Sequence, residues 1–199
     1  MIDLNTQITR RLEIDIEESV DRYKSILSIP KKHGSLIKDI ELVLLLVKEC
    51  GGVHDDQLTT SLMENFNISF NTARNIRPTL ERANLLLKWN KVIKLTNMSV
   101  LYFETQNIGY LSKGFINSYF GFLELLYLVN RRHPHRLTEL YSEWAKFYEG
   151  IYGERSTQTN ISQLNRIYNY LEGFNLISKN GDKIIVNEKA YLNLEKVDF

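Results

Sequence analysis

Apolar and polar residues alternate with helical spacing toward the C-terminal end of the chain and then change to a strand-like pattern. Over residues 157–174, apolar side chains recur every three or four positions, which predicts a helix with one buried face. Asn180-Gly181 then stands between two short apolar runs, 176–177 and 184–186, and this is the strongest short signal for a hairpin. We therefore predict a helix that leads directly into a two-stranded hairpin. The residues expected on the buried face of the helix are Ile161, Leu164, Ile167 (or Tyr168) and Leu171.

The same order of elements is predicted earlier in the chain, in residues 36–97. A strongly apolar helix is followed by glycines, a second amphipathic helix, a short turn, a third helix and two short strands. The predicted helices are about 36–49, 57–66 and 72–86, and the predicted strands are about 85–88 and 92–95. The later copy begins with an apolar helix at 122–130 and a second helix that opens at Leu137.

The two copies also share a sequence string at the end of the third helix. Leu80-Glu81-Arg82-Ala83-Asn84-Leu85-Leu86 matches Leu171-Glu172-Gly173-Phe174-Asn175-Leu176-Ile177 at a constant offset of 91 residues. The string resembles the end of the third helix in the winged-helix superfamily, where a leucine, an acidic residue and a small residue precede the wing. The usual glycine is replaced by Asn84 in one copy and by Asn175 in the other. Asparagine tolerates the left-handed backbone that this position requires.

The resemblance implies a mainly α fold with small β-hairpin wings (α+β), built from two tandem winged-helix domains and an N-terminal amphipathic helix. The expected division is an N-terminal helical extension at 1–35, a first winged-helix domain at 36–97, a connector at 98–119, and a second winged-helix domain with a C-terminal tail at 120–199.

The N-terminal extension has its own apolar stripe, with residues spaced by three or four, which predicts a helix that packs against a partner surface. We expect the helix either to pack on the first domain or to pair with a second copy in a homodimer. In the connector, residues 100–103 are expected to form a third strand or the start of a helix. The stripe consists of Leu12, Ile16, Val20, Tyr23 and Leu27.

Composition narrows the class of protein. Of the 199 residues, 43% are apolar and 25% charged, which is typical of globular proteins, and the longest apolar run is too short to cross a bilayer. No secretory signal is visible, and the single cysteine, Cys50, suits a reducing cytoplasm. The net charge of +1 argues against a protein that coats nucleic acid non-specifically. A DNA-binding surface would therefore need a local concentration of basic residues.

Residues 70–94 hold such a concentration, because six basic side chains stand there against one acidic side chain, Glu81. In winged helices the third helix enters the major groove and the wing contacts the backbone or the minor groove. By this resemblance, the first copy would bind double-stranded DNA through its third helix and, at the phosphates, through the lysines of its wing. The predicted residues are Asn71, Thr72, Arg74, Asn75 and Arg77 on the helix, and Lys88, Lys91 and Lys94 on the wing.

The second copy offers amide side chains instead of a basic cluster. Amides suit paired hydrogen bonds with adenine, and each good pair discriminates between bases by roughly 1–3 kcal/mol. The alternative is that this polar face is simply solvated. The predicted residues are Thr159, Asn160, Gln163, Arg166 and Asn169 on the helix, and Lys179 and Lys183 on the wing.

Other chemistry is less favoured by the sequence. The basic loop 131–136 contains His133 and His135, but Pro134 between them and the distance of other ligands along the chain argue against a metal site. We expect this loop to contact phosphate or to be solvated. No phosphate-binding loop, metalloprotease motif or nucleophile motif is present. We therefore expect neither an enzyme nor a cofactor.

Two functional hypotheses follow. The first is a sequence-specific double-stranded DNA-binding protein: a transcriptional regulator, a replication initiator or the recognition module of a restriction-type system. The second is a protein-interaction subunit, because tandem winged helices of this length and near-neutral charge resemble the kite-type partners of chromosome-organising ATPases. The 11 tyrosines favour the second hypothesis, since tyrosine is enriched at protein interfaces.

Overall fold

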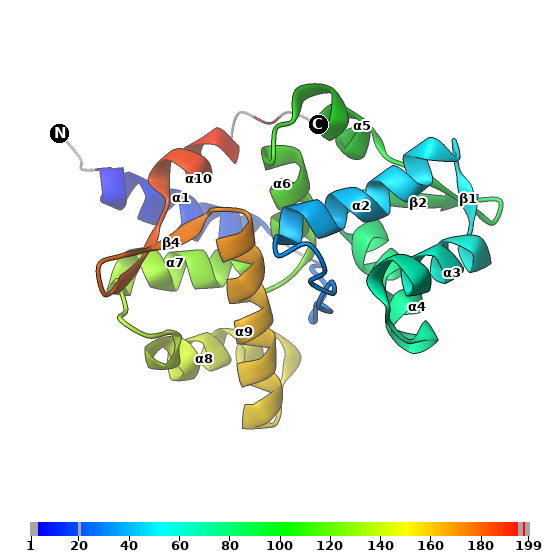
Figure 1. Ribbon diagram of the computed structural model, residues 1–199. Coiled ribbons are helices and arrows are strands. Elements are labelled where there is room, and N and C mark those ends of the chain that lie inside the picture. Colours follow the sequence, from blue (N-terminus) through cyan, green and yellow to red (C-terminus); the bar gives the residue numbers. More distant parts are fainter. Residues whose placement is uncertain (1–3, 20, 195–196, 198–199) are drawn as a thin grey trace. The chain divides into compact units, whose positions relative to one another are not determined.

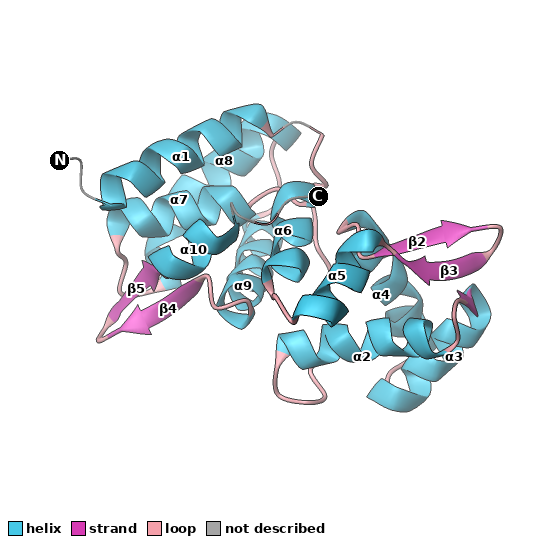
Figure 2. Ribbon diagram, turned by 90° about the horizontal axis from the view of Figure 1, so that it is seen from above, coloured by secondary structure: helices cyan, strands magenta, loops and turns pink. Residues whose placement is uncertain are grey.

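The computed structural model describes residues 4–19, 21–194 and 197, so Val20 of the predicted stripe lies outside the described residues. The chain divides into two compact units, which we call the central unit (residues 27–118) and the terminal unit (residues 1–26 together with 119–198). Both units consist mostly of helices with one small antiparallel sheet each (Figures 1 and 2). The predicted class, a mainly helical protein with small β-hairpins, is confirmed.

The central unit begins with three helices, and a hairpin follows them. Its elements are α2 (Leu36–Glu49), β1 (Val53–His54), α3 (Asp55–Phe66), α4 (Phe70–Arg82), β2 (Leu86–Trp89), β3 (Val92–Leu95), α5 (Asn97–Thr105) and α6 (Gly109–Ser118). The three helices bury one apolar face each, and Val43, Leu62 and Leu80 are among the fully buried side chains. Burial of this apolar surface is the main favourable term in folding.

The strands of the central unit form a sheet of order β1-β3-β2. Strands β2 and β3 pair from Leu86 opposite Leu95 to Trp89 opposite Val92. Asn90 and Lys91, which join them, both have positive φ angles, 48° and 66°. Two residues of positive φ are what a tight hairpin turn of matching twist requires. The sequence did not indicate the third strand, β1, because it is only two residues long.

Residues 98–119 differ from the connector that we predicted. They form α5 and α6, and both helices contribute to the core of the central unit, with Tyr102 and Phe115 among the buried residues. At Gly114 the helix α6 lies so close to the end of α4 that a Cβ atom would stand 2.2 Å from the carbonyl oxygen of Ala83. Residues 100–103 are helical, so the alternative of a third strand at this position is wrong.

The terminal unit has the same order of three helices and a hairpin, preceded by one helix and followed by another. Its elements are α1 (Leu4–Glu18), α7 (Phe122–Arg132), a 3-10 turn η1 (Leu137–Leu140), α8 (Tyr141–Tyr152), α9 (Thr157–Gly173), β4 (Ile177–Asn180), β5 (Lys183–Val186) and α10 (Glu188–Leu194). Strands β4 and β5 pair antiparallel as a two-stranded sheet.

The repeated sequence string forms the same helix end in both units. Asn84 and Asn175 have φ angles of 54° and 59°, as expected for residues that replace a left-handed glycine. The next residue closes the helix in each case: the amide of Leu85 donates to the carbonyl of Leu80, and the amide of Leu176 donates to that of Leu171, both at 2.9 Å. The offset of 91 residues therefore marks a repeat of three-dimensional structure as well as of sequence.

Helix α1 belongs to the terminal unit, whereas we predicted that it packs on the first domain or forms a dimer. It lies along α7 in both views (Figures 1 and 2), and Ile8 and Leu12 are buried between them. The Nδ2 atom of the buried Asn130 donates to the Oδ1 atom of Asn5 at 2.6 Å and to the Oγ1 atom of Thr9 at 2.9 Å. The buried apolar residues of α1 are thus covered within the chain. Of the predicted stripe, Leu12 is buried and Ile16 is half-buried, whereas Tyr23 and Leu27 lie beyond the end of the helix and are exposed.

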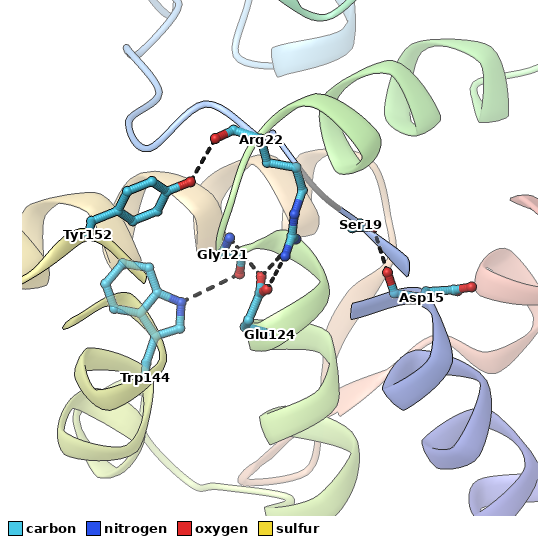
Figure 3. Close-up of polar contacts among 7 residues, drawn as sticks. All are labelled: Asp15, Ser19, Arg22, Gly121, Glu124, Trp144 and Tyr152. Atoms are coloured by element: carbon cyan, nitrogen blue, oxygen red, sulfur yellow. Dashed lines mark hydrogen bonds and ion pairs between the residues drawn. The ribbon is translucent and has the colours of Figure 1, made fainter. Parts of the chain in front are cut away.

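A short segment after α1, residues 22–26, which we call the strap, is held in the terminal unit by a buried ion pair (Figure 3). The guanidinium of Arg22 contacts both carboxylate oxygens of Glu124, at 3.1 and 2.5 Å, and the two side chains are 3% and 0% exposed. The amide of Gly121 also donates to Glu124, at 2.7 Å, and the Arg22 guanidinium stands over the ring of Phe120. Every charge in this cluster is therefore matched by an opposite charge or a hydrogen bond.

We predict that Glu124→Gln destabilises the terminal unit by about 3–5 kcal/mol, because it leaves the Arg22 guanidinium buried without its counter-charge. The measurement is urea unfolding followed by the emission of Trp144, in a Trp89→Phe background where Trp144 is the remaining tryptophan. The matched control is Glu143→Gln, which breaks the exposed pair with Arg132 in the same unit and is expected to cost about 0–1 kcal/mol. Equal losses in the two variants would contradict the role given to the buried pair.

Candidate nucleic-acid interface

Helix α4 of the central unit has an exposed polar face at its N-terminal half. Asn71, Thr72, Arg74 and Asn75 are all exposed, as we predicted from the sequence, whereas Ala73 and Ile76 point into the core. Ser69 caps the N-terminus of the helix, and its hydroxyl accepts from the amide of Thr72. Thr72 and Ser69 also share a hydrogen bond between their hydroxyls at 3.1 Å, so Thr72 helps to fix the start of the helix.

Two of the predicted basic residues are engaged by carboxylates of the same unit. The guanidinium of Arg77 contacts Asp55 at 2.7 Å and Glu81 at 2.5 Å, and the ammonium of Lys88 contacts Asp55 at 2.8 Å. Because Asp55 is the first residue of α3, its carboxylate links α3 to both α4 and the hairpin. The predicted local excess of positive charge is therefore partly neutralised, and the side chain of Arg77 is only 19% exposed.

The surroundings of Asp55 lower the pKa of its carboxyl group below the ordinary value. Partial burial acts in the opposite direction and is the largest single influence, but the hydrogen bond from Lys88 and the positive charges of Arg77 and Lys88 together outweigh it. Asp55 is thus ionised at neutral pH and holds both cations in place.

The β2–β3 hairpin carries the remaining basic residues and an exposed aromatic side chain. Lys91 and Lys94, which we predicted to contact phosphate, are exposed on this hairpin. Trp89, the last residue of β2, is 66% exposed. Phe70, the first residue of α4, is also exposed, at 54%. Sequence reasoning missed both aromatic residues as surface features, although each stands at the end of an element, outside its apolar stripe.

Helix α9 of the terminal unit buries the predicted residues Leu164, Ile167 and Leu171, but its buried face is wider than we predicted. Asn160 and Gln163 lie on its buried face, at 6% and 7% exposed, in the same stripe as Leu164 and Ile167. The side chain of Gln163 accepts from the amide of Ile26 at 3.0 Å, and the guanidinium of Arg166 donates to the carbonyl of Ile26 at 3.2 Å. Gln163 and Arg166, which we predicted to read bases, are therefore occupied by the backbone of the strap, whereas the amide of Asn160 donates to Glu149 of α8.

The outward face of α9 is made of other polar residues. Gln158, Asn165 and Asn169 are exposed, and of these only Asn169 was predicted. Thr159 is half-buried, and its amide is capped by Ser156, as in the first copy. Lys179 and Lys183, which we also predicted to contact DNA, are exposed on the second hairpin.

The two units differ in net charge. The central unit has 11 Lys and Arg against 8 Asp and Glu, a net charge of +3, whereas the terminal unit has 14 against 16, a net charge of −2. A polyanion would thus be attracted more strongly by the central unit.

The basic loop after α7 is tied to acidic residues of its own unit. The imidazole of His135 lies 3.0 Å from the carboxylate of Asp182, and Arg132 pairs with Glu143 at 2.9 Å. Among the described residues, no group of three or more His, Cys, Asp or Glu is placed to hold a metal ion. None of the helices in the described part of the chain has the length and apolar character needed to span a membrane.

Comparison with protein-family models finds no match, and comparison with curated proteins finds none either. Among solved structures, the chain is similar to the BpuJ1 endonuclease binding domain, which was crystallised in complex with pyrene- and phenanthrene-modified DNA. The TM-score is 0.53 at 13% sequence identity, and the match covers 88% of this chain and 84% of that chain. At this identity the similarity shows that the two chains share a fold.

We predict that Asp55→Asn destabilises the central unit at pH 7 by about 1 kcal/mol, because the Arg77 and Lys88 pairs are partly exposed and screened. Since the pKa of Asp55 is lowered by folding, its stabilising effect is full above the unfolded value of 3.8 and disappears as the pH falls through the folded value. The difference between wild type and variant in urea unfolding should therefore shrink to nothing in acid. Asp56→Asn removes the same charge from an exposed neighbour, and a loss as large as that of Asp55→Asn would contradict the assignment.

Proposed function

We propose that this protein binds double-stranded DNA and that its two units are tandem winged helices, with the central unit supplying the principal contact surface. The observation that carries the proposal is the exposed polar face of α4, with Arg74 at its centre, on a helix that packs against a hairpin. The hairpin has three exposed lysines, Lys88, Lys91 and Lys94, of which Lys88 pairs with Asp55. A helix of this kind has the diameter that the major groove of B-DNA admits.

The positions on α4 suit the reading of base edges. Arg74 and Asn75 follow Asn71 by three and four residues, so all three lie on one side of the helix near its N-terminus. An arginine can donate two hydrogen bonds to guanine, and an asparagine can form a pair of hydrogen bonds with adenine. The helix N-terminus itself favours a nearby phosphate. In this arrangement Arg77 acts as a positioning residue, since Asp55 and Glu81 hold its guanidinium.

The β2–β3 hairpin is proposed as the wing. Lys91 and Lys94 would pair with phosphates, and the exposed indole of Trp89 would lie against the sugar-phosphate backbone or the minor groove. Lys88 is less available to a phosphate, because its ammonium group already pairs with the carboxylate of Asp55.

Two further observations support this proposal. The BpuJ1 endonuclease binding domain, which shares this fold, was crystallised in complex with DNA. The net charge of the central unit is also favourable for a polyanion. For the terminal unit we propose a secondary contact through the outward residues of α9, Gln158, Asn165 and Asn169, and the lysines of its hairpin. We infer a binding role without catalysis, as in a regulator, an initiator or the recognition part of a restriction system.

A protein partner is the second candidate, and the exposed apolar side chains of the central unit favour it. Phe70, Leu87 and Trp89 are all exposed, and aromatic residues are enriched where proteins associate. Phe70 and Trp89 begin and end elements of the proposed DNA surface, so the two candidates compete for the same region.

We predict that the protein binds a random-sequence duplex with an affinity that falls steeply with salt, with a slope of about −0.9 for each phosphate contacted. In a fluorescence-anisotropy titration, Arg74→Ala and Lys94→Ala should each weaken binding by about three- to tenfold at low salt, and the loss of a phosphate contact should reduce the slope by about one. Lys38→Ala removes an exposed charge from α2 of the same unit and is expected to leave binding unchanged. No binding at low salt would overturn the proposal, and a search for protein partners would then follow.

We also predict that duplex DNA protects Trp89 from a soluble quencher. Trp89 is 66% exposed and Trp144 is 1% exposed, so acrylamide quenching of the wild type reports mainly on Trp89. Adding duplex should lower the quenching constant at least twofold, and Trp89→Phe should abolish this change while weakening the affinity. Binding of DNA with unchanged quenching would exclude Trp89 from the interface.

A further inference from the structure

A cavity of about 290 Å³ lies within the terminal unit, between helices α8 and α9. Its walls are apolar and aromatic, with Tyr141, Trp144 and Leu164 among the residues that line it. Its polar groups include the carboxylate of Glu149 and the side chain of Asn160. Cavities of about 300–1,000 Å³ with apolar walls and few polar groups are typical of small-molecule sites, and this one is at the lower end of that range.

The side chain of Asn160 is only partly satisfied in this cavity. Its Nδ2 atom donates to the Oε1 atom of Glu149 at 3.4 Å, while its Oδ1 atom is buried and has no hydrogen-bond partner among the described residues. Asn160 is 94% buried and occupies a position of α9 whose neighbours in the same stripe are Leu164 and Ile167. Buried carbonyl oxygens in proteins almost always accept a hydrogen bond. The Oδ1 atom of Asn160 can therefore accept a hydrogen bond from a ligand, because the surrounding residues supply no donor to it.

The groups around the cavity indicate the chemistry of that ligand. The rings of Trp144 and Tyr141 supply apolar surface in the cavity wall, against which the apolar part of a ligand can pack. Glu149 contributes a half-buried carboxylate, and Asn160 contributes a carbonyl oxygen that accepts from N–H. We propose that this cavity binds a small organic ammonium ion, with its charged group between Glu149 and Asn160 and its apolar body against Trp144 and Leu164.

This site is distinct from the principal DNA surface proposed above, because its residues belong to the terminal unit and that surface belongs to the central unit. It also explains why Asn160 stands on a buried face. An apolar residue at this buried position would avoid the cost of an unpaired polar atom. Asn160→Leu should therefore maintain or raise the thermal midpoint while removing the acceptor for the ligand. A residue whose replacement stabilises the protein but abolishes binding is typical of a functional site.

The test uses the full chain with Trp89→Phe, so that Trp144 in the cavity wall is the remaining tryptophan. Phenethylammonium is titrated while the emission of Trp144 and the thermal midpoint are recorded. We expect a saturable change in emission with a dissociation constant of about 0.1–10 mM, which is reasonable for so small a ligand, and a rise in the midpoint. The anion 3-phenylpropanoate has the same ring and a similar length, and it should bind at least tenfold more weakly.

Variants distinguish this site from non-specific binding. Asn160→Leu and Glu149→Gln should each weaken phenethylammonium binding at least fivefold, and Glu149→Gln should reduce the preference over the anion. Asn165→Leu makes the same change on the outward face of α9 and should leave binding unaltered. An unsaturable response, equal binding of the anion, or equal effects of Asn160→Leu and Asn165→Leu would overturn the proposal.

Discussion

The buried ion pair between Arg22 and Glu124 is the constraint on which the terminal unit depends. An unpaired charge at this depth would be costly, so the strap cannot leave its place unless both charges are hydrated at once. With Arg22 fixed, the strap backbone finds its partners on neighbouring helices. The hydroxyls of Tyr152 and Tyr148 donate to the carbonyls of Arg22 and Lys24, at 2.6 and 2.7 Å. A segment without regular structure is thereby ordered by side chains from α7, α8 and α9.

Because of the strap, the polar faces of the two corresponding helices, α9 in the terminal unit and α4 in the central unit, have different surroundings. In the terminal unit, Gln163 and Arg166 of α9 bind the backbone of the strap. These two residues, which we predicted to contact DNA bases, therefore face inward. In the central unit no such segment covers the corresponding face of α4 within the described residues, and Arg74 stays exposed. The same helix and hairpin therefore serve internal packing in one unit and present an open polar surface in the other.

Local signals in the sequence were sufficient for much of the fold. The hairpin signal at Asn180-Gly181, the repeated helix end at Asn84 and Asn175, and the apolar periodicity of the third helices each depend on residues near one another in the chain. In the hairpin itself Asn180 pairs with Lys183, so Gly181 and Asp182 form the turn. Predictions that depend on distant partners were less successful. The packing of α1 on α7 and the inward turn of Gln163 follow from contacts more than 100 residues apart, which no local pattern contains. An amide on a buried face is read as a surface residue unless its distant partner is known.

The candidate DNA surface shows the same limit for charge. A count of residues 70–94 includes Arg77 and Lys88 as free cations, but Asp55, 15 residues before the start of α4, pairs with both. These pairs connect α3, α4 and the hairpin. Arg77 and Lys88 are therefore less available to attract phosphate, but they fix α4 and the hairpin relative to each other. A preorganised surface loses less conformational entropy on binding than a flexible one. For the proposed DNA-binding function, we therefore expect the affinity to depend mainly on Arg74, Lys91 and Lys94, which the ion pairs of Asp55 with Arg77 and Lys88 hold in place.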